Sequence, residues 1–124
     1  MTKAEALYAY FSGFGLPAFE ESALYPETPP ETPYLTYERV DGRLCDGATP
    51  FSFTVHGRDT SLAQCEEIAE AVGETLSGGG CVLPCDEGYI WLLPGAPLMQ
   101  LAPDADDPRV KRTVFHAVAE FLTN

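Results

Sequence analysis

Two segments carry apolar residues at the spacing of a helix that buries one side. In residues 3–12 the apolar positions recur every three or four residues, and Thr2 with Glu5 gives the spacing of a capping box. Residues 61–76 combine an apolar stripe with a row of glutamates. The stripe is Leu62, Cys65, Ile68, Ala69, Val72 and Leu76, and the glutamates are Glu66, Glu67, Glu70 and Glu74. We predict helices over both segments, each covering a sheet.

Other segments have the composition or alternation of β-strands. Phe51, Phe53 and Val55 alternate with polar residues, which is typical of a strand buried on one face. The segments predicted as strands are 34–41, 51–57, 81–85, 89–93 and 98–101. The first two would form a hairpin with a long tip. The next two would form a second hairpin, and a turn at Pro94-Gly95 would separate it from the last strand.

The remaining segments are less regular. Residues 109–123 fit a helix stripe or a strand buried on both faces, and their β-branched residues favour a strand. Residues 17–33 hold five prolines and are predicted to form an extended loop. The chain is therefore expected to be one α+β domain, residues 1–124. Its central sheet would be mixed or mostly antiparallel, with an N-terminal helix and one long helix packed on one face and a C-terminal strand.

Charge excludes several classes of partner. The 124 residues hold 7 Lys and Arg against 19 Asp and Glu, a formal net charge of −12. Nucleic-acid binding is driven by basic side chains at phosphates, and anionic membranes also attract basic surfaces, so neither is expected as a partner. No apolar run has the length of a membrane-spanning helix. Residues 1–5 lack the apolar centre of a signal peptide, so the chain is expected in the cytoplasm.

Candidate chemical groups are sparse. No sequence spacing places either histidine, His56 or His116, beside a thiol or hydroxyl nucleophile. The four cysteines, Cys45, Cys65, Cys81 and Cys85, are expected to be reduced thiols, with structural zinc as the alternative. Asp104, Asp106 and Asp107 form either a cation-binding loop or a solvated turn. We therefore predict no enzymatic activity and no cofactor or metal.

A chain this acidic repels its own copies, so self-association would have to bring opposite charges together. Arginine at a strand edge suits bidentate pairing with a neighbour's carboxylate. The residues predicted at such interfaces are Glu20, Glu21, Glu27, Glu31, Arg39, Arg58, Asp104, Asp106, Asp107 and Arg109.

Five blocks of sequence together resemble a known family. They are Leu7-Tyr8-x-x-Phe11-x-x-Phe14-Gly15-Leu16-Pro17-Ala18, Pro33-Tyr34-Leu35-Thr36-Tyr37-Glu38, Glu67-Ile68-Ala69-Glu70-Ala71-Val72-Gly73, Trp91-Leu92-x-x-Gly95-x-Pro97-x-x-Gln100, and Asp106-Asp107-x-x-x-Lys111-Arg112 through to Ala119-Glu120-Phe121-Leu122. These blocks resemble the tail terminator family (tail-completion or tail-to-head joining proteins) of siphophages and prophages of Gram-positive bacteria.

The resemblance implies a non-catalytic virion protein that forms a ring, expected to be a homohexamer. Such a ring caps the tail tube and offers a docking face to the head connector. The implied partners are further copies of the chain, the tail tube protein and a head connector or neck protein. The implied location is the virion tail or neck, after assembly in the host cytoplasm. Two alternatives stay open, namely another neck component (a head-closure or stopper protein) and a small cytoplasmic metal- or ligand-binding module.

Overall fold

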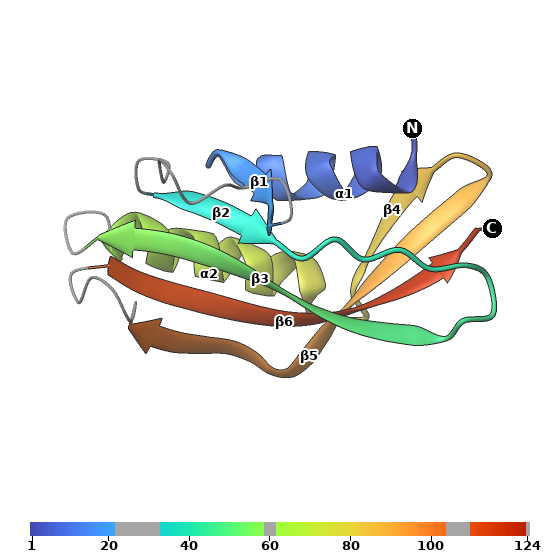
Figure 1. Ribbon diagram of the computed structural model, residues 1–124. Helices are drawn as coiled ribbons and strands as arrows, with labels where there is room; N and C mark the ends of the chain where they lie inside the picture. The colour runs from blue at the N-terminus through green and yellow to red at the C-terminus, as the bar shows by residue number, and fades with distance from the viewer. Residues whose placement is uncertain (22–32, 59–61, 104–109, 124) are drawn as a thin grey trace.

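The structure is a computed structural model that describes residues 1–21, 33–58, 62–103 and 110–123 (Figure 1). In chain order the elements are α1 (Lys3–Ser12), β1 (Ala18–Glu20), β2 (Tyr34–Tyr37), β3 (Ala48–Arg58), α2 (Leu62–Leu76), β4 (Cys81–Cys85), β5 (Gly88–Pro103) and β6 (Val110–Leu122). The two predicted helices are confirmed, with α2 described from Leu62 onward.

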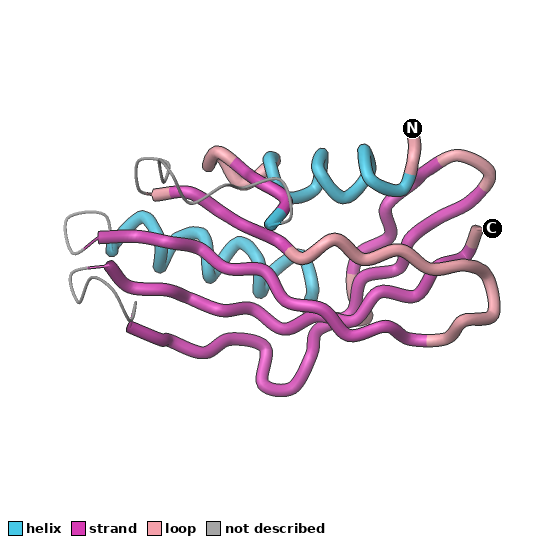
Figure 2. Tube along the Cα trace, viewed as in Figure 1, coloured by secondary structure: helices cyan, strands magenta, loops and turns pink. Residues whose placement is uncertain are grey.

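The six strands form one sheet in the order β1-β2-β3-β6-β5-β4. β1 pairs with β2 in parallel, and the other pairs are antiparallel. Figure 2 shows the long strands β3, β5 and β6 running side by side along the molecule, with the hairpin of β4 and β5 turning up at one end. The predicted α+β fold with a central mixed sheet is confirmed.

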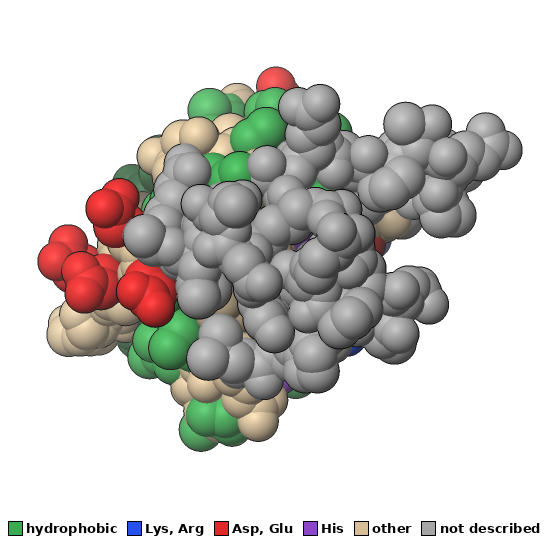
Figure 3. Space-filling model, turned by 90° about the vertical axis from the view of Figure 1, so that its left-hand side faces the viewer, with side chains coloured by type: hydrophobic (Ala, Val, Ile, Leu, Met, Phe, Trp, Pro, Cys, Tyr) green, Lys and Arg blue, Asp and Glu red, His purple; other side chains and the backbone are tan. Residues whose placement is uncertain are grey.

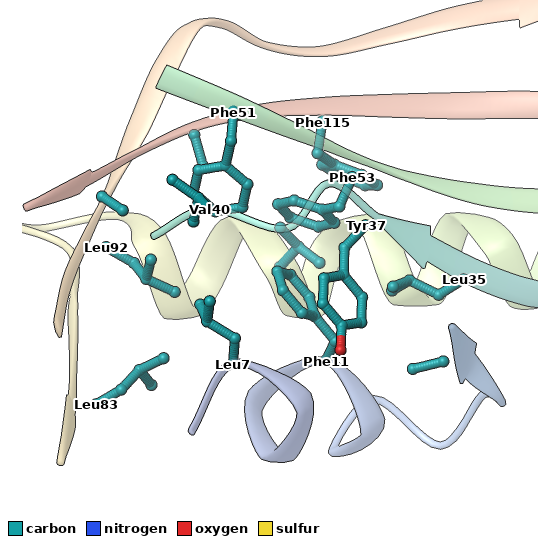
Figure 4. Packing of buried hydrophobic residues seen from close by; sticks show 14 of the residues in the cluster. Leu7, Phe11, Leu35, Tyr37, Val40, Phe51, Phe53, Leu83, Leu92 and Phe115 are labelled. Atoms are coloured by element: carbon teal, nitrogen blue, oxygen red, sulfur yellow. The ribbon is translucent and has the colours of Figure 1, made fainter. Parts of the chain in front are cut away.

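Both helices contribute to one apolar cluster on the same face of the sheet. Phe11 of α1 stacks on Tyr37 and lies 4.9 Å from the ring of Phe53, which in turn stacks on Phe115 at 5.0 Å (Figure 4). From α2, Val72 is fully buried in this cluster, together with Ile68 and Leu76. Burial of these aromatic and aliphatic side chains is the main favourable term in folding.

Specific contacts mark the start of α1 and the end of α2. The capping box of α1 is confirmed, because the Thr2 side chain accepts from the Glu5 N–H and the Glu5 side chain accepts from the Thr2 N–H. The glycines that follow α2 have positive φ, and a Cβ on Gly80 would lie 2.1 Å from the Leu92 carbonyl oxygen. Glycine is therefore required where the chain passes from α2 into β4.

The predicted extended loop over residues 17–33 is wrong at its start, because Ala18–Glu20 forms β1. Pro17 lacks an N–H, but the pairing with β2 uses its carbonyl, which accepts a hydrogen bond from the Leu35 N–H at 2.8 Å. The predicted strand over 34–41 is shorter than expected, since β2 ends at Tyr37.

The predicted turn at Pro94-Gly95 is also wrong. β5 continues from Gly88 to Pro103, with a register shift between Pro94 and Met99 that absorbs the extra residues. The physical reason is that β6 pairs with β5 on both sides of the irregularity. Gly95 lies against this partner so closely that a Cβ would be 2.8 Å from the backbone of His116.

The preference for a C-terminal strand is confirmed by β6, but the expected burial on both faces is wrong, because only every second described residue is buried. It lies between β3 and β5, and its buried residues alternate along the strand. The fully buried members are Phe115, Ala119 and Phe121. β-Branched residues pack well in a strand that is paired on both sides, as β6 is.

Candidate functional site

The sheet face opposite the helices is the first candidate surface. In β3 and β6 the core side chains have odd numbers, and the alternate residues point to the other face. No described helix covers those alternate residues, which include Ser52, His56, Val114 and His116. This open face is mainly polar, unlike the face that the helices cover.

His56 lies on the open face and forms structural contacts there. Its Nε2 lies 2.9 Å from the Thr36 hydroxyl, and its ring stacks on Tyr34 at 4.5 Å. A histidine in these contacts ties β3 to β2, since Thr36 and Tyr34 both belong to β2.

A hollow of about 420 Å³ lies on the same face, beside the irregular part of β5. Its lining includes Glu38, Pro50, Ser52, Ala96 and His116. The Ser52 hydroxyl donates to the Glu38 carboxylate at 2.5 Å. The hollow is therefore partly polar and open at the surface.

Ser52 and His116 lie opposite each other in the register of β3 and β6, so a nucleophile–base pair is the arrangement to test here. Their hydrogen bonds run elsewhere, however. Ser52 donates to Glu38, and His116 Nε2 lies 3.0 Å from the amide oxygen of Gln100. The described contacts therefore tie Ser52 to Glu38 and His116 to Gln100.

Three of the predicted interface residues come together at the ends of β1 and β2. Glu20 lies opposite Tyr37, and burial followed by the charge of Glu20 raises the pKa of Tyr37, while Arg39 lowers it. Burial also raises the pKa of Glu21, with a smaller contribution from the charge of Glu38. This end of the sheet is thus an acidic corner that includes one arginine.

The other predicted interface residues are not part of this corner. Arg58 is the last residue of β3, and the register of β3 with β2 places it beyond Tyr34, at the opposite end of β2 from Arg39. The remaining predicted residues, Glu27, Glu31, Asp104, Asp106, Asp107 and Arg109, lie outside the described residues.

The glutamates predicted on the solvent side of α2 are exposed where α2 is described. Glu66, Glu67, Glu70 and Glu74 are exposed, and no ion pair engages them among the described residues. Figure 3 shows acidic side chains gathered on one side of the described surface. These carboxylates therefore concentrate negative charge on one side of the surface, which attracts cationic groups and repels anionic ones.

The described cysteines are free thiols. Cys45 is exposed, and Cys81 and Cys85 are partly buried, which raises the pKa of both thiols. The side chain of Cys65 lies outside the described residues. Within residues 1–21, 33–58, 62–103 and 110–123, no group of three or more His, Cys, Asp or Glu side chains could hold a metal ion. Neither described helix is long and apolar enough to cross a bilayer.

Sequence reasoning missed Glu38, Ser52, Gln100 and His116 as neighbours on one surface. The alternation around Ser52 predicts its face correctly, but the pairing of β3 with β6 sets which residue lies opposite. That pairing joins segments about 60 residues apart, so local pattern carries no signal for it.

The fold matches that of a solved virion component. A chain in a structure described as "Virion of native gene transfer agent (GTA) particle" superposes with a TM-score of 0.58 at 17% sequence identity. The match covers 94% of this chain and 88% of that chain, so the two share a fold over nearly their whole length. No protein-family model matches the chain, and no curated protein has significant sequence similarity to it.

Proposed function

We propose that the protein is a virion structural protein of the tail terminator type. In this role it forms a ring, expected to be hexameric, that caps the tail tube and joins it to the head connector. The observation that carries the proposal is the shared fold with a chain of a gene transfer agent virion, which spans 94% of this chain. The sequence blocks that resemble tail terminators support the same assignment independently of the fold.

The surface chemistry is consistent with an assembly role. Ser52 and His116 are held by Glu38 and Gln100 instead of by each other. A ring built from heterologous contacts needs two different surfaces on each subunit. The open face of the sheet and the helical side of the molecule are two such surfaces. An acidic surface next to a DNA channel would repel phosphates and keep the DNA from adhering.

Tail length tests the proposal. We expect particles assembled without this protein to have tails longer than normal, because nothing then stops growth of the tube. Their heads and tails should also fail to join. Restoring the protein should restore both the normal length and the joining. Tails of normal length that remain unjoined would contradict the terminator role and favour another neck component.

A further inference from the structure

One half of β5 has no strand on its outer side. β4 pairs only with residues 88–92 of β5, whereas β6 pairs with β5 as far as Pro103. The sheet order ends in β5 and β4, so beyond the irregularity β5 is the edge of the described sheet. Figure 2 shows this half of β5 as the lower border of the sheet.

The direction of the backbone groups along this edge follows from the neighbouring strands. The Glu38 N–H donates to the Ser52 carbonyl at 3.1 Å, so the Ser52 carbonyl points away from β6. Along an antiparallel strand, the N–H and C=O groups of successive residues point alternately to the two neighbouring strands. Those of Phe53 therefore point toward β6 and bond to Phe115, its partner there. The N–H and C=O of Phe115 point toward β3, and those of the residues on either side of it point toward β5.

The same alternation continues into β5. The N–H and C=O of Val114 point toward β5, where Gln100 lies opposite. Gln100 therefore uses its own N–H and C=O in the ladder with β6. The residues on either side, Met99 and Leu101, turn their N–H and C=O groups away from β6. These groups face the free edge, where no described strand accepts them.

The middle of this edge contains neither charge nor proline. Leu98–Ala102 lies between Pro97 and Pro103, and the Met99 side chain is 44% exposed. Natural edge strands are usually protected by charge, proline or short length. Between its two prolines, the free half of β5 therefore offers an uncharged stretch of strand edge to another strand.

The proposed ring makes a neighbouring copy of this chain the occupant, and charge favours this segment as the place of contact. Two copies of a chain with a net charge of −12 repel each other over most of their surfaces, and they repel least where an uncharged segment forms the contact. We propose that the backbone of Leu98–Ala102 pairs with a different strand edge, β1 or β4, of a neighbouring copy of this chain, and that this contact joins the subunits of the ring. The inference rests on the proposed function for the ring itself.

Amide hydrogen exchange of the full chain, compared between monomer and assembled forms, tests this contact residue by residue. We expect the Met99 and Leu101 amides to exchange roughly tenfold or more slowly on assembly, because they gain a partner. The Gln100 and Ala102 amides should be slow in both forms. Exchange at Met99 and Leu101 that is equally fast in both forms would overturn the inference. So would a chain that stays monomeric both alone and beside tail tubes, even if the tubes slow these amides.

A pair of variants separates the backbone contact from the side chain. Met99→Pro removes one outward N–H and leaves the ladder with β6 intact, whereas Met99→Ala keeps the N–H and shortens the side chain. We expect Met99→Pro to lose assembly and Met99→Ala to keep it. Circular dichroism checks that both are folded, and the exchange experiment on the unmodified chain stands if Met99→Pro fails to fold. A folded Met99→Pro that assembles like the original chain would overturn the inference.

The outcomes also distinguish this inference from the proposed function. A ring that forms with exposed Met99 and Leu101 amides would overturn the edge contact and leave the terminator role standing. A two-fold dimer joined through this edge as the final assembly would keep the contact and contradict the ring, because a closed two-fold pair leaves no site for further subunits.

Discussion

The two faces of the sheet differ in what they contribute. The face under the helices holds stacked aromatic rings and fully buried aliphatic side chains, among them Phe53, Phe115 and Val72. The open face holds hydroxyls, imidazoles and a hollow. Ser52 and His116 beside the hollow are only partly buried, whereas Thr36 and Thr54 on the same face are buried. The comparison indicates that the covered face stabilises the fold and that the part of the open face around Ser52 and His116 is available to other molecules.

The largest effect is expected at the centre of the covered face. Phe53→Ala should lower the free energy of unfolding by about 3 to 5 kcal/mol, because it removes a fully buried ring and leaves a cavity beside Phe11 and Phe115. Urea denaturation measures the change. A loss below about 1 kcal/mol would show that this aromatic stack does not hold the core together.

A smaller effect is expected where α2 meets β4. Gly80→Ala places a Cβ 2.1 Å from the Leu92 carbonyl oxygen at a φ of +87°, so we expect a loss of about 1 to 3 kcal/mol. Gly78→Ala is the matched control, since its φ is +69° and no atom lies within 4 Å of the added Cβ. Thermal unfolding of both variants separates the effect of the clash from that of the backbone strain, which the two positions share. Equal losses of stability in the two variants would contradict a clash between the added Cβ and Leu92.

The contact between the two helices is expected to be weaker still, and to depend on pH. The Tyr10 hydroxyl lies 2.6 Å from that of Thr75, and Tyr10→Phe should cost about 0.5 to 1.5 kcal/mol. Burial raises the pKa of Tyr10 from 10.0 to about 12, while the bond to Thr75 lowers it. The unfolded chain therefore loses this proton first, and stability should fall as the pH rises from 10.0 to about 12.

Tyr10→Phe should flatten that decline, because phenylalanine has no proton to lose. Unfolding measured across the alkaline range in both chains gives the comparison. An identical decline in the two chains would assign the pH dependence to other groups.

The smallest effect is expected on the open face. Ser52→Ala removes an exposed hydrogen bond to Glu38, and we expect a change within about 0.5 kcal/mol. Urea denaturation again measures it. A loss as large as that of Phe53→Ala would contradict the division between a stabilising face and an open face.

The parts of the fold that the sequence predicts are those with local patterns. Both helices, the strand around Phe53 and the hairpin of β4 and β5 have periodicity or turn residues within a single segment. β1 has three residues beside a proline, and its parallel pairing with β2 is set by distant contacts. At Pro94-Gly95, residues that usually mark a turn coincide with a register shift, and β5 continues beyond it because β6 pairs with the residues on both sides.

The candidate site was less accessible to sequence reasoning than the fold. Charge pattern indicated Glu20, Glu21 and Arg39, which the structure brings to one corner. The free edge at Met99 could not be foreseen, because it depends on β5 extending beyond the end of β4. Which strand lies at an edge is a property of sheet order, and sheet order is not encoded in any one segment.

The molar mass of the protein in solution, alone and with purified tail tubes, tests the central claim most directly. Light scattering behind a sizing column should give a mass near six subunits for the free ring or, where the tube acts as template, six copies bound per tube end. A chain that remains monomeric alone and leaves the tube ends bare would contradict the ring and with it the terminator role.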